Sequence, residues 1–173
     1  MLHIEARAEI LMAAIREFND SCVNGGESRL KNANEAYESV LHELNIGCRS
    51  LYGEGSIALE TLERCASLNG EVPLWGQIGE FVMNVEGMTT LVRYHPQFHR
   101  WNALHFEFLA LDRYKPYISR TGYKSLFMNN LKFGCSLHES AQKAFSGMMQ
   151  GRLPLPAREY TPAWYDKPML LQE

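Results

Sequence analysis

Residues 93–132 interleave cations with aromatic rings, a combination typical of surfaces that bind nucleic acid. Seven Lys or Arg residues stand here against two carboxylates, Glu107 and Asp112, and the segment contains nine of the chain's 19 aromatic residues. A core strand and helix with charged ends in water would have the same composition. The residues of this segment that we expect to contact a partner are Arg93, Arg100, Trp101, Arg113, Lys115, Arg120, Tyr123 and Lys124.

The charge is distributed unevenly along the chain. Residues 1–92 contain six Lys or Arg and 14 Asp or Glu, a net charge of −8, whereas residues 93–132 have a net charge of +5. Within one domain the acidic and basic parts can face each other, or the acidic face can keep nucleic acid or a partner on one side only. We expect Glu35, Glu38 and Glu43 to contribute to that surface, on one helix.

Histidine and cysteine offer one set of metal ligands. His95 and His99 are four residues apart, and Cys135 and His138 are three apart, which suits chelation of zinc within each pair. However, Pro96 interrupts the first pair, no CxxC motif accompanies the second, and His105 could replace either histidine of the first pair. We therefore expect surface or hydrogen-bonded histidines, no bound metal and no cofactor.

Signatures of catalysis are missing. The sequence contains no GxSxG, and no paired carboxylates stand apart from the helix faces where solvation explains them. Gly122-Tyr123-Lys124-Ser125 lacks the upstream glycine and the adjacent Gly-Lys pair of a nucleotide-binding P-loop. Arg120 and Lys124 beside this turn could still hold a phosphate of a nucleic-acid backbone. We expect a protein that is not an enzyme.

The ten residues Ile118-Ser119-Arg120-Thr121-Gly122-Tyr123-Lys124-Ser125-Leu126-Phe127 resemble a stretch found in small, uncharacterised proteins of plasmids and phages. The resemblance implies a mobile-element protein, and some of these block host defence systems. Such systems have nucleic-acid channels, so an inhibitor of them would profit from an acidic surface.

Hydrophobic periodicity predicts four helices before residue 87. The first covers residues 4–22, and the second runs from an N-cap at Ser28 to Asn45. Ser56 is expected to cap the third helix, and Pro73 to start a fourth that continues to Val85. The short connection between the first two predicts an antiparallel helical hairpin.

After Gly87 the pattern changes to that of a small antiparallel sheet. Residues 88–94 predict a strand that His95-Pro96 ends, and residues 123–127 predict another. Residues 101–114 fit either a helix or a strand, and we favour a strand over 104–111 because a lone strand needs a partner. Residues 135–150 predict a helix, and four prolines after Arg152 predict an extended tail.

Length and composition indicate one ordinary globular domain. The chain has 173 residues, 46% of them apolar and 21% charged, without an apolar run near the ~20 residues of a membrane helix. Four scattered cysteines favour reduced thiols, and the acidic N-terminus does not resemble a signal peptide, so we expect a cytoplasmic protein.

These observations predict a mostly helical α+β domain over residues 1–173. An acidic helical part (1–86) precedes a basic aromatic sheet part (87–132), a helix (133–151) and the tail (152–173), with the sheet at about 88–127. Two function classes remain open: a protein-binding inhibitor or adaptor, which the negative net charge favours, and a nucleic-acid-binding protein with little sequence preference. The sequence does not determine the oligomeric state.

Overall fold

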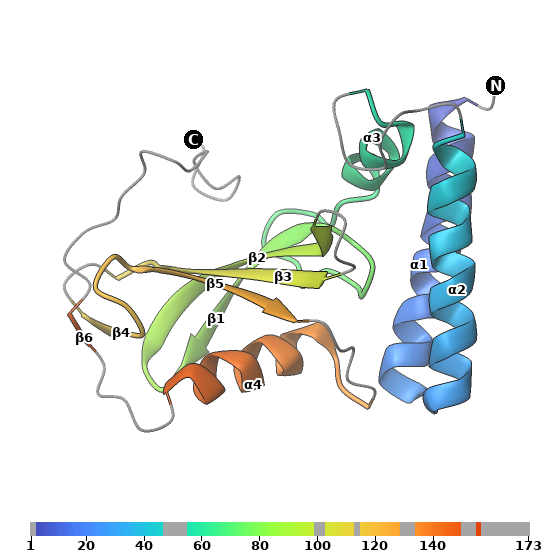
Figure 1. The fold of residues 1–173 in the computed structure, drawn as a ribbon. Helices are drawn as coiled ribbons and strands as arrows, with labels where there is room; N and C mark the ends of the chain where they lie inside the picture. Colours follow the sequence, from blue (N-terminus) through green and yellow to red (C-terminus); the bar gives the residue numbers. More distant parts are fainter. Residues whose placement is uncertain are drawn as a thin grey trace.

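The computed structural model describes residues 3–46, 55–98, 103–112, 115–128, 134–149 and 155–156. In these residues the chain is an α+β protein, as predicted, built from helices α1–α4, a four-stranded antiparallel sheet and a small two-stranded ladder. A helical hairpin stands beside one end of the sheet, and α4 covers one face of it (Figure 1). Within the described residues, no helix is both long enough and apolar enough to cross a membrane.

The hairpin consists of α1 (Ile4–Asn24) and α2 (Glu27–Leu44). The second helix begins at Glu27 with Gly26 as its N-cap, so the predicted cap at Ser28 is wrong. The second helix starts this early because the chain turns tightly at Gly25, where any Cβ would collide with the carbonyl oxygen of Ser21. The facing apolar stripes meet in the stacked rings of Phe18 and Tyr37, 5.2 Å apart.

Helix α3 (Ile57–Arg64) begins where the sequence predicts. The hydroxyl of Ser56 accepts a hydrogen bond from the Leu59 N–H at 3.0 Å, which satisfies one of the free amides of the first turn. The Ser56 hydroxyl also donates to Asn45 Oδ1 at 3.1 Å, so the cap ties the helix to the end of α2.

The sheet begins earlier than predicted. No helix forms over residues 73–85, so this prediction is wrong: residues 75–76 form a turn and strand β1 (Gly79–Val85) follows. Burial alternates from Phe81 to Val85 with a period of two, and Glu86 and Gly87 both have positive φ (53° and 79°), as a two-residue hairpin turn requires. The turn pairs β1 with β2 and overrides the 3–4 spacing of Trp75, Ile78, Val82 and Val85.

The sheet has the strand order β1-β2-β3-β5, all antiparallel. Strand β2 (Met88–Phe98) runs past Pro96, contrary to the predicted end at His95, with an irregular register between His95 and Phe98. Strand β3 (Ala103–Ala110) confirms the choice of strand over helix, and β5 (Tyr123–Met128) confirms the last predicted strand.

The C-terminal part adds α4 (Leu137–Met149) and a short ladder between β4 (Pro116–Tyr117) and β6 (Leu155–Pro156). The remainder of the predicted tail lies outside the described residues. Phe145 of α4 packs edge-on against Phe108 of the sheet and Tyr117 of β4. One apolar core therefore runs from the hairpin through the sheet to α4.

Trp75 connects the hairpin to the rest of the molecule. Its backbone N–H donates to Asn19 Oδ1 and its indole Nε1–H to the carbonyl of Cys135, both at 3.1 Å. The next residue, Gly76, has φ +90°, and a Cβ there would press on the rings of Phe18 and Tyr37. That the whole chain forms a single domain stays a prediction.

Candidate functional site

Polar and aromatic side chains gather on the face of the sheet opposite to α4. Strand pairing sets Glu80, Arg93 and Glu107 in one row across β1, β2 and β3, because Arg93 stands opposite both glutamates. The next row contains His95, His105 and Phe127, from β2, β3 and β5. We call these six residues, together with Tyr123 of β5, the sheet-face cluster.

Arg93 forms ion pairs with both glutamates of its row. Its Nε lies 2.8 Å from Glu80 Oε1, and its Nη1 lies 3.3 Å from Glu107 Oε2. The side chains of Arg93, Glu80 and Glu107 are only 16%, 4% and 12% exposed. Two carboxylates around one guanidinium leave a formal charge of −1 in a setting with little water, where removal of one partner is costly.

The two histidines of the second row lie in surroundings that favour their neutral form. Burial lowers the pKa of both His95 and His105, and the nearby carboxylate of Glu107 opposes this only in part. The His105 ring stacks on Phe127 with centroids 4.3 Å apart, while its Nε2 lies 4.0 Å from Glu107 Oε1. The Tyr123 hydroxyl donates to the same oxygen of Glu107 at 3.3 Å. Arg93, Tyr123 and His105 thus converge on Glu107.

This arrangement suits the fixing of strand register better than proton transfer. The guanidinium lies between the two carboxylates, whereas acid–base pairs of carboxylates flank a reacting bond or share a proton. Three neighbouring strands are instead tied together by charged hydrogen bonds from a single arginine.

The metal-ligand candidates do not come together. His95 lies on the sheet-face cluster, whereas His138 of α4 packs on the Phe81 ring at the opposite face of the sheet. The thiol of Cys135 is buried against the Ser140 hydroxyl at 3.0 Å, and His99 lies outside the described residues. Across the part of the chain that the structure describes, no group of three or more His, Cys, Asp or Glu side chains could hold a metal ion.

The cations predicted to contact a partner differ in their environment. Arg93 is engaged by Glu80 and Glu107, and Lys115 lies 3.1 Å from Asp112 at the surface. Arg120 and Lys124 are exposed, on the turn before β5 and on β5 itself. Arg100, Trp101 and Arg113 lie outside the described residues.

Most of the described rings of residues 93–132 are interior. Tyr94, Phe106, Phe108 and Tyr117 are at most 2% exposed and belong to the core, where no base could stack on them. Tyr123 is half-buried beside Glu107, and Phe127 is exposed.

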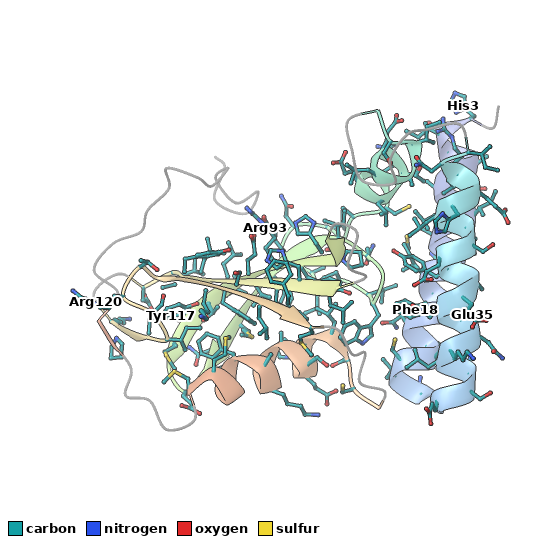
Figure 2. All side chains as sticks on the ribbon, viewed as in Figure 1. His3, Phe18, Glu35, Arg93, Tyr117 and Arg120 are labelled. Carbon is teal, nitrogen blue, oxygen red and sulfur yellow. The ribbon has the colours of Figure 1, made fainter. Side chains whose placement is uncertain are left out.

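The acidic candidates lie on α2. Glu35 and Glu43 are exposed and Glu38 is half-buried, all turned away from the buried stripe of Leu30, Ala33, Tyr37 and Leu41. Figure 2 shows Glu35 on the hairpin and Arg120 at the opposite end of the molecule. The hairpin helices together have eight Asp or Glu and four Lys or Arg. Of these cations, Arg29 pairs with Glu17 and Asp20 at the closed end of the hairpin, and Lys31 lies 3.9 Å from Glu35.

Sequence reasoning missed Glu80 as the partner of Arg93. The helix expected over 73–85 placed Glu80 on a solvated helix face. The strand-forming residues Phe81, Val82 and Val85, followed directly by Glu86-Gly87 and a second strand-like run, are the signal that would have revealed the hairpin.

Comparison with known proteins points to one family. A family model described as the KlcB third domain matches residues 78–164, about half of the chain, and its first residue immediately precedes β1. Two relatives, both called Protein KlcB and both from Escherichia coli, are similar to this chain. One is 34% identical over 118 residues, which cover 67% of this chain and 29% of the relative. The other is 30% identical over 176 residues, which cover 92% of this chain and 37% of the relative.

The chain therefore spans about a third of the length of these relatives. No solved structure matches it. KlcB is a plasmid-encoded protein, which agrees with the mobile-element origin implied above, although these matches do not single out the stretch of residues 118–127. The chain belongs to the KlcB family.

Proposed function

We propose that this chain is a non-enzymatic adaptor or inhibitor that binds a basic surface of a protein partner through the acidic face of α2. The face is defined by Glu35, Glu38 and Glu43. The partner class that fits is a host complex that handles nucleic acid or acts in defence, because its channel is lined with cations and an acidic helix can occupy it.

One observation carries this proposal: four described rings of the basic-aromatic segment (residues 93–132), those of Tyr94, Phe106, Phe108 and Tyr117, lie in the core. Binding of single-stranded nucleic acid relies on exposed rings that stack on bases, which these four cannot do. Arg93 is likewise neutralised between two carboxylates. The glutamates of α2 point outward, where they can meet a partner.

The test is capture of partners from a host lysate, with and without nuclease treatment. Reversal of charge in the E35K/E38K/E43K variant should weaken binding of the captured protein on the order of tenfold or more. A matched control reverses three exposed glutamates away from this face, Glu60, Glu63 and Glu71, and should bind as the wild type does. Equal losses in both variants, or capture that disappears with nuclease, would contradict the proposal.

A second candidate is weak binding of nucleic-acid backbone by the turn before β5. Arg120 and Lys124 are both exposed there, without an ion pair to another described residue. In this case R120A/K124A should flatten the plot of log K against log [salt] by about 1–2 units. Affinity should fall alike for unrelated sequences, because phosphate contacts carry no base information. A wild type that shifts no short single-stranded DNA at physiological salt would exclude this candidate.

A further inference from the structure

The face of the sheet that carries the sheet-face cluster also buries two leucines. Leu91 of β2 and Leu109 of β3 stand opposite each other, in the row next to that of Arg93. They are 0% and 1% exposed, although they point away from α4 and are not part of the apolar core that reaches it. The free face of an antiparallel sheet is normally in contact with water. A further layer therefore covers these two leucines.

This layer is narrow. Val82 of β1, in the same row as the two leucines, is 47% exposed, and Phe127 of β5, on the same face, is 52% exposed. The central strands are thus covered while the edge strands remain open. Strands lie about 4.8 Å apart, so the outer two of this sheet are separated by about 14 Å. A helix is about 10 Å across, whereas one extended chain has the width of the gap that the burial describes.

The described elements do not supply this layer. Helix α4 lies on the other face, and the other three described helices stand together beside one end of the sheet (Figure 1). Each of the seven residues of the sheet-face cluster nonetheless has a further hydrogen bond, ion pair, ring contact or electrostatic interaction besides those given above. The exposed fractions are those of a single chain, so the layer belongs to the chain itself.

We propose that residues 157–173, the C-terminal segment, lie extended across this face and cover Leu91 and Leu109. The segment follows β6, which pairs with β4. Strand β4 comes between β3 and β5 in the chain, at the end of the sheet where Leu109 stands opposite Tyr123. Seventeen extended residues reach about 56 Å, far more than the width of the sheet. The other stretches outside the described residues have at most eight residues.

The composition of the C-terminal segment suits this position. Pro162 and Pro168 disfavour a helix and favour an extended chain. Five large apolar or aromatic side chains can form the layer over the leucines: Trp164, Tyr165, Met169, Leu170 and Leu171. The family model likewise runs from the residue before β1 to Trp164, so it includes the sheet and the first half of this segment in one unit.

Photo-cross-linking in the full chain tests the position of the segment. The probe p-benzoylphenylalanine replaces Val82, which is exposed and stands directly opposite Leu91. Irradiation should give an intramolecular cross-link to a residue of 157–173, identified by mass spectrometry and independent of protein concentration. The matched control replaces Lys143, which is exposed on α4 at the other face, and should give no such cross-link. Cross-links from position 82 only to other residues or to a second copy, or equal cross-linking from both positions, would overturn the proposal.

Limited proteolysis tests the contact through the segment's own side chains. Trypsin can cleave after Arg158, and a docked segment should protect this bond in the native protein. Substitution of three anchors, W164A/L170A/L171A, should accelerate cleavage after Arg158 at least tenfold. The control T161A/Q172A should be cleaved at the wild-type rate. A triple variant that is cleaved no faster than the wild type refutes the docking. The glutamates of α2 are unchanged in every variant, so the outcome is independent of the proposed function.

Discussion

Replacement of Arg93 by methionine should destabilise this protein more than the loss of any other described cation. Methionine keeps the apolar length of the side chain but removes the guanidinium that contacts Glu80 and Glu107. Both glutamates are at most 12% exposed, so the variant loses the cation beside two buried carboxylates. Breaking a buried ion pair from one side costs about 3–5 kcal/mol, a large fraction of the roughly 5–15 kcal/mol by which domains are stable.

Urea unfolding measures this loss of stability. Arg120→Met is the matched control, because Arg120 is exposed and its loss should change the free energy of unfolding by less than about 0.5 kcal/mol. The triple variant E80Q/R93M/E107Q should recover part of the stability, since it removes the buried charges as well as their partner. A cost below about 1 kcal/mol for R93M would refute the assignment of Arg93 to a buried network.

Three further predictions follow from the packing. Limited proteolysis should not release a stable fragment of residues 1–87, because Trp75 bonds to both α1 and the carbonyl of Cys135; such a fragment would indicate separate units. Because burial lowers the folded-state pKa of His95 and His105, stability should be fully present above about pH 6.5 and decline as pH falls below it. In urea titrations, H105F should weaken this decline; an unchanged slope would argue against His105 as its source. The described thiols of Cys22, Cys65 and Cys135 should react with Ellman's reagent only after unfolding, because all three are buried. Burial also raises the pKa of the Cys22 thiol to about 12. Fast reaction of these thiols in the native protein would contradict this prediction.

Local patterns in the sequence determined most of the elements. The apolar stripes of α1 and α2, the cap at Ser56 and the alternation within β3 each depend on neighbours a few residues apart. The α+β class and the hairpin of the first two helices could be predicted on this basis. The acidic and basic halves were equally evident, because formal charge is a property of composition.

Only the tertiary structure decided which cations and rings of residues 93–132 are buried or paired. Whether residues 79–85 form a helix or a strand depended on pairing with β2, a contact that local spacing does not report. That pairing brought Glu80 to Arg93, and the register of β3 brought Glu107 to the same guanidinium. A cation expected to face a partner thus became part of the interior, because burial and neutralisation depend on residues distant in the sequence.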